Sequence, residues 1–143
     1  MSPSELKEKS RSTLRIITGI LAAIMAIAIF ILSSIPGNDY PTHPAFLNTV
    51  VHFFLYAALG ICLTLALNSP RRALWLTALF AILITSAYGA SDEIHQIFTP
   101  HRSPDVLDWL TDTAGALVGA IGTIWVLSAR KVKRSRSRDS MLK

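Results

Sequence analysis

Cysteine is nearly absent from this sequence, which has a single one, Cys62, inside an apolar run. A lone cysteine excludes an intrachain disulfide and a cysteine-rich metal site, so we interpret Cys62 as a small buried apolar residue. Phosphate-binding glycine loops are also missing, and neither Ser91 nor Ser103 lies in a nucleophile elbow. Nucleophilic serine or cysteine chemistry therefore has no support in the sequence.

Charged residues are scarce in four long stretches, at about 16–32, 46–67, 73–88 and 110–127, where Asp112 is the only one. At about 1.5 Å per helical residue, each stretch covers most or all of a hydrocarbon core about 30 Å thick. Of the 143 residues, 51% are hydrophobic, which is too many for an ordinary soluble domain of this size. The sequence predicts an all-α membrane protein with four transmembrane helices.

The first apolar stretch follows basic residues, which is also a feature of cleaved signal peptides. Its apolar run is long, however, and no Ala-x-Ala cleavage site follows it. We therefore expect this stretch to remain as the first transmembrane helix.

Basic residues are almost confined to one set of predicted connections, which sets the orientation by the positive-inside rule. Thirteen lie in the N-terminal segment, the connection after the second stretch and the C-terminal tail: Lys7, Lys9, Arg11, Arg15, Arg71, Arg72, Arg130, Lys131, Lys133, Arg134, Arg136, Arg138 and Lys143. Only Arg102 lies in the other two connections. We expect a basic cytoplasmic segment at 1–14, a membrane domain at 15–130 and a basic cytoplasmic tail at 131–143. Such ends favour contact with anionic lipid headgroups over nucleic acid.

The segment 91–112, which joins the third and fourth spans, concentrates the polar chemistry of the chain. It contains five of the nine acidic residues and two of the four histidines. With both termini cytoplasmic, this polar loop lies at the outer membrane surface. If the third helix continues past Tyr88, then Tyr88, Asp92 and Gln96 share one helix face, with His95 beside them.

Two rows of residues predict that other helices contribute to the same site. On the fourth span, Asp108 and Asp112 continue into the glycine stripe Gly115, Gly119 and Gly122, which permits close helix approach. The second span offers a matching row at i+4 spacing: Asn48, His52, Tyr56, Gly60 and Thr64. We therefore predict one polar pocket formed by three helices. Gly115 and Gly119 also offer a surface for a homo-oligomer.

Charged side chains near hydrocarbon cost on the order of 2.5 to 3.5 kcal/mol and normally face partners or water. Our candidates for acid-base catalysis are Asp92, Glu93, His95 and Asp108, and our candidates for ligand binding are His52, Tyr56, Gln96, Arg102 and Asp112. A structural alternative remains open, in which Arg102 pairs with Glu93 or Asp108 and fixes the loop. Carboxylates and imidazoles are also metal ligands, but their spacing fits no compact motif, so the metal and any cofactor stay unassigned.

Several of these residues form an ordered set along the chain: His52 and Tyr56, Asp92-Glu93-x-x-Gln96, Pro100-x-Arg102, and Asp108-x-x-x-Asp112-x-x-Gly115-x-x-x-Gly119. In this set the sequence resembles the VanZ-like family, named for a protein associated with teicoplanin resistance. Relatives often have Asp-Lys where this chain has Asn48 and Thr49, asparagine at the position of Asp112, and glycine at that of His101. The resemblance implies a multi-pass protein of the bacterial cytoplasmic membrane that is connected with glycopeptide susceptibility at the cell envelope.

Two classes of function follow from these features. In the first, the outer pocket binds or modifies a lipid-linked or surface molecule, with Arg102 holding an anionic headgroup; whether this involves catalysis stays open. In the second, the protein is a non-catalytic scaffold or partner-binding module whose charged cluster is structural. A transporter is disfavoured because the four spans contain no inverted repeat.

Overall fold

The protein is a bundle of four helices in the computed structural model, which describes residues 1–37 and 45–140. The helices are α1 (Pro3–Ser33), α2 (Ala45–Leu67), α3 (Leu74–Gln96) and α4 (Val106–Ser140), and no strand occurs within the described ranges. Each helix contains a stretch long and apolar enough to cross a membrane. The predicted all-α architecture with four membrane-spanning helices is confirmed at this level.

A capping box explains why α1 begins before the first apolar stretch. At the start of α1, Ser2 and Glu5 form a capping box, in which each side chain accepts a hydrogen bond from the other residue's backbone N–H. α1 ends at Ser33, shortly before Pro36. The helix therefore includes basic residues from the segment 1–14 as well as the first apolar stretch.

α3 continues to Gln96, beyond the expected end of the third span at Tyr88. Tyr88, Asp92 and Gln96 therefore belong to one continuous helix and share one face of it, as predicted. α4 begins at Val106, next to Asp105, whose carboxylate accepts the backbone N–H of Leu107 at 2.8 Å. Much of the acid-rich segment is thus helical, and only residues 97–105 connect α3 to α4.

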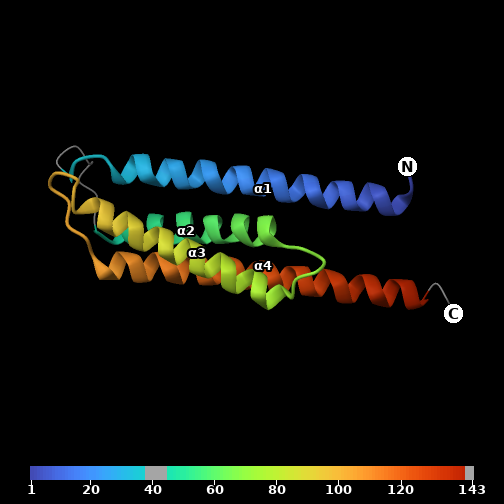
Figure 1. Cartoon of the computed structure of the whole chain (residues 1–143). Coiled ribbons are helices and arrows are strands. Elements are labelled where there is room, and N and C mark those ends of the chain that lie inside the picture. Colours follow the sequence, from blue (N-terminus) through green and yellow to red (C-terminus); the bar gives the residue numbers. More distant parts are fainter. Residues whose placement is uncertain (38–44, 141–143) are drawn as a thin grey trace.

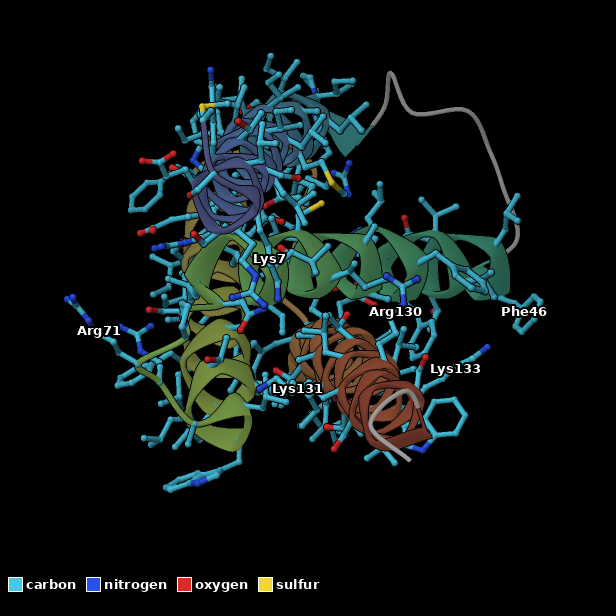
Figure 2. The ribbon with its side chains drawn as sticks, turned by 90° about the vertical axis from the view of Figure 1, so that its right-hand side faces the viewer. Lys7, Phe46, Arg71, Arg130, Lys131 and Lys133 are labelled. Carbon is cyan, nitrogen blue, oxygen red and sulfur yellow. The ribbon has the colours of Figure 1, made fainter. Side chains whose placement is uncertain are left out.

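The two chain termini lie at the same end of the bundle, together with the α2–α3 connection, and the α3–α4 connection lies at the opposite end (Figure 1). Seen from the end that carries the termini, α1 is viewed nearly along its axis, whereas α2 crosses the bundle obliquely (Figure 2). Phe46, near the start of α2, lies away from α1. α1 and α2 therefore diverge toward the end that contains the α3–α4 connection.

Glycines bring α2 and α4 into close contact. A Cβ atom added to Gly115 would lie 2.3 Å from the backbone oxygen of Phe53, and one added to Gly119 would lie 2.1 Å from that of Ala57. A Cβ atom added to Gly122 would meet nothing within 4 Å, so this third glycine of the stripe is not in close contact with α2. The predicted close approach of α2 and α4 at these glycines is confirmed, but the residues opposite them, Phe53 and Ala57, lie beside the predicted row of α2. Because Gly115 and Gly119 are covered by α2, a homo-oligomer would have to use another surface.

The residue distribution is that of a protein surrounded by lipid. The side chains buried between helices are mostly small or polar, including Ala81, Ala116, Ala120, Thr64, Thr77 and Thr85. Large apolar side chains such as Ile24, Phe54 and Leu83 are instead exposed. Small residues permit close helix packing where apolar burial gives no advantage over lipid.

Polar contacts at several points join α1 and its C-cap residue Ser34 to the other helices. Arg15 donates from Nε to the backbone oxygen of Ala66 at 3.1 Å, near the termini. Further along, the Tyr88 hydroxyl donates to the backbone oxygen of Ala26 at 2.5 Å. At the opposite end, Ser34 Oγ lies 3.0 Å from His95 Nε2. These contacts position α1 beside the predicted polar site.

Candidate functional site

A pocket of about 550 Å³ lies at the end of the bundle opposite the termini, between α1, α2 and the last turns of α3. The described residues that line it are Ile29, Leu32, Ser33, Gly37, Leu47, Asn48, Val51, His52, Leu55, Tyr56, Asp92, Gln96 and Arg102. This volume falls within the range of about 300–1,000 Å³ that is typical of small-molecule sites. Five of the nine predicted site residues line this one pocket.

The α2 side of the pocket has one polar row and one apolar row. Asn48, His52 and Tyr56 follow one another at i+4 spacing. Leu47, Val51 and Leu55 form a second row at the same spacing, each one residue earlier in the chain. Val51 follows Asn48 by three residues, and Leu55 follows His52 by three, so members of the two rows are neighbours on the helix surface. α2 therefore offers both kinds of surface to one ligand.

His52 and Asp112 form the polar contact between α2 and α4. Nδ1 of His52 lies 3.1 Å from Oδ1 of Asp112, whose side chain is completely buried. The contact fixes the orientation of the imidazole ring and leaves Nε2 as its other polar atom on a residue that lines the pocket. A histidine oriented in this way is suited to bind a ligand or to transfer a proton.

Gly89 on α3 provides the space for this pair. A Cβ atom at Gly89 would lie 3.2 Å from Oδ2 of Asp112 and 3.3 Å from the ring of Tyr56. Those contacts are tighter than ordinary van der Waals distances. The absence of a side chain at Gly89 therefore allows Asp112 and Tyr56 to lie against α3.

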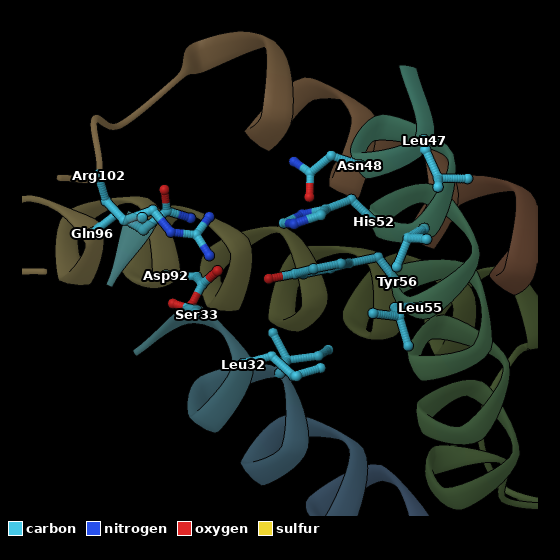
Figure 3. Close-up of a pocket in the computed structure, with 13 residues that line it drawn as sticks. Leu32, Ser33, Leu47, Asn48, His52, Leu55, Tyr56, Asp92, Gln96 and Arg102 are labelled. Carbon is cyan, nitrogen blue, oxygen red and sulfur yellow. The ribbon is translucent and has the colours of Figure 1, made fainter. Parts of the chain in front are cut away.

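Asp92 is the least satisfied charged group of the pocket. Its side chain is 4% exposed, and neither carboxylate oxygen has a hydrogen-bond partner in residues 1–37 and 45–140. The hydroxyl of Tyr56 is also buried without a partner in that part of the chain. The Asp92 carboxylate, the Tyr56 hydroxyl and the Arg102 guanidinium are directed toward the same region (Figure 3). These groups have the capacity to bind a polar ligand.

Glu93 holds the α3–α4 connection to the end of α3. Its Oε2 accepts the backbone N–H of Asp105 at 2.6 Å, and its Oε1 accepts the Gln96 amide at 3.3 Å. Arg102 in the same connection donates from Nε to the backbone oxygen of Ile35 at 3.4 Å. These contacts link the connection to both α3 and the segment that follows α1.

Comparison with known proteins agrees with this arrangement of residues. A family model described as VanZ/LLP1 matches residues 4–127. The chain belongs to the VanZ/LLP1 family. No curated protein and no solved structure gives a significant match.

The residues that carry the family resemblance meet at the pocket end of this VanZ/LLP1 protein. His52, Tyr56, Asp92, Gln96 and Arg102 line the pocket, and Asp112 supports His52 from α4. His101, where relatives often have glycine, has a φ of 58°. Glycine adopts that left-handed conformation without steric cost, which gives a physical reason for glycine at this position in relatives.

Three of the four candidate catalytic residues of this VanZ/LLP1 protein, namely Glu93, His95 and Asp108, lie outside the pocket lining. His95 contacts α1, where Nε2 lies 3.0 Å from Ser34 Oγ and the ring centroid is 4.6 Å from that of Phe30. Asp108 lies in the first turn of α4 and is partly buried. Glu93 instead accepts hydrogen bonds from the Asp105 backbone and the Gln96 side chain, as described above.

Sequence reasoning missed several residues of the VanZ/LLP1 pocket. The apolar row of Leu47, Val51 and Leu55 was detectable, because it precedes the polar row by one residue throughout. Gly89 was also detectable, because a glycine three residues before Asp92 on a helix predicts that a neighbouring element packs closely beside that carboxylate. Ser33 carried no such signal, because its role depends on where α1 ends.

Within the described residues, no group of three or more His, Cys, Asp or Glu side chains is arranged to hold a metal ion.

Proposed function

We propose that this protein lies in the cytoplasmic membrane of a bacterial cell envelope and binds an amphiphilic, lipid-linked molecule in its pocket. The pocket end faces outward in this proposal, and handling of the bound molecule alters susceptibility to teicoplanin-type glycopeptides. The observation that carries the proposal is the pairing of the apolar row Leu47, Val51 and Leu55 with a polar row on the same helix. A molecule with both an apolar chain and a polar headgroup matches such a lining.

The apolar side of the pocket has access to surrounding lipid. Leu32 of α1 and Leu47 and Val51 of α2 are exposed as well as pocket-lining. α1 and α2 diverge at this end of the bundle, as the position of Phe46 indicates (Figure 2). An amphiphile can therefore enter sideways from the bilayer, with its headgroup directed toward Asp92 and Arg102.

The distribution of basic side chains supports the outward orientation. Lys7, Arg71, Arg130, Lys131 and Lys133 lie at the end that carries the termini (Figure 2). Basic residues are retained on the cytoplasmic side of membranes, so the pocket end faces the other side. The connection with glycopeptides is supported by the family resemblance.

Glycopeptide susceptibility of a bacterium that produces the protein tests the proposal. We expect the native chain to raise the inhibitory concentration of a teicoplanin-type glycopeptide, and the pocket variants Asp92→Asn and Arg102→Gln to lose most of that increase. Glu8→Gln, which removes an exposed carboxylate in the N-terminal part of α1, serves as the control. Protein levels in the membrane are measured for every variant. Pocket variants that are as effective as the native chain, at equal levels, would overturn the proposal.

A second candidate function is a non-catalytic scaffold, and the contacts of Glu93 favour it. Its carboxylate stabilises the α3–α4 connection through Asp105 and Gln96. The scaffold function predicts that Asp92→Asn keeps the phenotype whereas Gly115→Leu, which separates α2 from α4, abolishes it. Ligand binding predicts that Asp92→Asn alone is sufficient to abolish it.

Catalysis within the pocket depends on a group that can transfer protons. His52, oriented by Asp112, is better placed for that role than His95, which contacts α1. Turnover of the bound amphiphile that is lost in His52→Gln and retained in His95→Gln would support an enzymatic function.

A further inference from the structure

We propose that the headgroup of the bound amphiphile is zwitterionic, with a primary ammonium group held by Asp92 and Tyr56 and a phosphate held by Arg102. This inference rests on the proposed function, because it specifies the chemistry of the molecule in the same pocket. It differs from the simpler expectation of an anionic headgroup, which considers Arg102 alone.

Asp92 determines one half of the headgroup. Its carboxylate is buried, lines the pocket and has no hydrogen-bond partner among the described residues. An unpaired carboxylate away from water is costly, and hydrogen bonds from a cationic donor offset that cost most effectively. A ligand that donates hydrogen bonds to Asp92 therefore stabilises the folded protein as well as the complex.

Tyr56 adds a second polar oxygen at the same place. Its hydroxyl is completely buried, has no partner in the described part of the chain and is directed toward Asp92 (Figure 3). A primary ammonium has three N–H donors, which suit two carboxylate oxygens and one hydroxyl oxygen. A quaternary ammonium has no N–H donor and leaves these oxygens unsatisfied.

Arg102 determines the other half of the headgroup. It is the one lysine or arginine among the described residues that line the pocket, and it comes from the α3–α4 connection. The planar guanidinium forms paired hydrogen bonds with phosphate oxygens. Asp92 lies on α3, so ammonium and phosphate would contact two different elements of the structure.

Charge balance favours a zwitterion over an anion. Asp92 and Arg102 have opposite charges, and Asp112 adds a further carboxylate behind His52. A headgroup with net negative charge would bring an additional anion close to Asp92 without a second arginine or lysine in the described lining. A neutral pair of ammonium and phosphate adds no net charge to a pocket whose described lining has one carboxylate and one guanidinium.

The apolar chain of the same molecule would occupy the space between α1 and α2. Ile29 and Leu32 form the α1 side of this space, opposite the apolar row of α2. The exposed position of Leu32 and Val51 connects this part of the pocket with the surrounding lipid. A large side chain at Val51 would block the chain without altering the polar groups.

Lipid binding to the purified full chain in detergent tests the inference. Native mass spectrometry compares phosphatidylethanolamine, phosphatidylcholine, phosphatidylglycerol and phosphatidic acid with identical acyl chains. We expect phosphatidylethanolamine to bind roughly tenfold or more tightly than phosphatidylcholine, because charged hydrogen bonds are lost when the amine is methylated. Asp92→Asn should abolish this preference and Tyr56→Phe should reduce it, whereas Glu8→Gln should preserve it. Thermal unfolding checks that each variant is folded.

Different results identify which of the two proposals is wrong. Equal binding of phosphatidylethanolamine and phosphatidylcholine, or tighter binding of phosphatidylglycerol or phosphatidic acid, would overturn the zwitterionic headgroup but keep an amphiphile pocket. Val51→Trp should block every lipid, while Phe54→Trp, at an exposed residue outside the lining, should not. If no lipid binds the native chain, or if Val51→Trp changes nothing, the amphiphile pocket is also overturned.

Discussion

Nδ1 of His52 and Oδ1 of Asp112 lie 3.1 Å apart and form a side-chain hydrogen bond between α2 and α4. The other oxygen of Asp112 is buried without a hydrogen-bond partner in that part of the chain. The pair therefore satisfies only part of a buried carboxylate, and His52 provides that part. The orientation of His52 in the pocket and the stability of the bundle depend on the same contact.

Removal of His52 should destabilise the protein. His52→Ala leaves Asp112 buried without its partner, which we expect to cost about 1–3 kcal/mol and to lower the midpoint of thermal unfolding in detergent. The double variant His52→Ala, Asp112→Asn should be more stable than the sum of the single effects indicates, because no unpaired charge remains. Single effects that add to within about 0.5 kcal/mol would show that the two side chains are not coupled.

Glycines at two positions of α4 should respond differently to the same substitution. Gly119→Ala forces α4 away from the backbone of Ala57, and we expect a loss of at least about 1–3 kcal/mol. Gly122→Ala meets no neighbouring atom and should be neutral or stabilise the helix by up to about 1 kcal/mol. Thermal unfolding of the two variants gives the comparison. Similar losses at both positions would contradict the close contact at Gly119.

The α3–α4 connection should become more dynamic when Glu93 is shortened. Glu93→Ala removes the acceptor for the Asp105 N–H, so we expect faster hydrogen exchange in residues 97–105. Glu93→Gln keeps one acceptor oxygen and should have a smaller effect. Exchange in α2 provides the internal control, because it does not depend on this contact. Unchanged exchange in Glu93→Ala would rule out the structural role of this residue.

The orientation in the membrane can be measured by labelling with a thiol reagent that does not cross membranes. In a Cys62→Ala background, a cysteine at Ser103 should react in intact cells, because Ser103 is exposed at the pocket end. A cysteine at Ser10, which is exposed on α1, should react only after permeabilisation. The opposite pattern would contradict the outward position of the pocket.

The sequence allowed much of the fold to be predicted because membrane helices have a strong signal. Apolar stretches gave four helices, and the spacing of Gly115 and Gly119 gave the contact with α2. Helix ends were less predictable, since α3 continues through polar residues to Gln96. Polar residues at that end are stabilised by contacts with other elements, which hydropathy does not record.

The roles of individual site residues were harder to predict than their proximity. Asp92 and Glu93 are neighbours in sequence, yet one is unpartnered in the described pocket and the other holds a connection. A helix turns by about 100° per residue, so adjacent side chains meet different surroundings. His95 likewise faces α1 and not His52. Such differences depend on tertiary packing, which residue type alone does not specify.

The oblique path of α2 also bears on the lipid around the protein (Figure 2). Its 23 residues are about 34 Å long along the helix axis, but an inclined helix spans a smaller thickness of hydrocarbon than its own length. Lipid chains next to the start of α2 would need to shorten or tilt to cover the same apolar height. Membranes with thinner cores should therefore accommodate this protein with the least distortion.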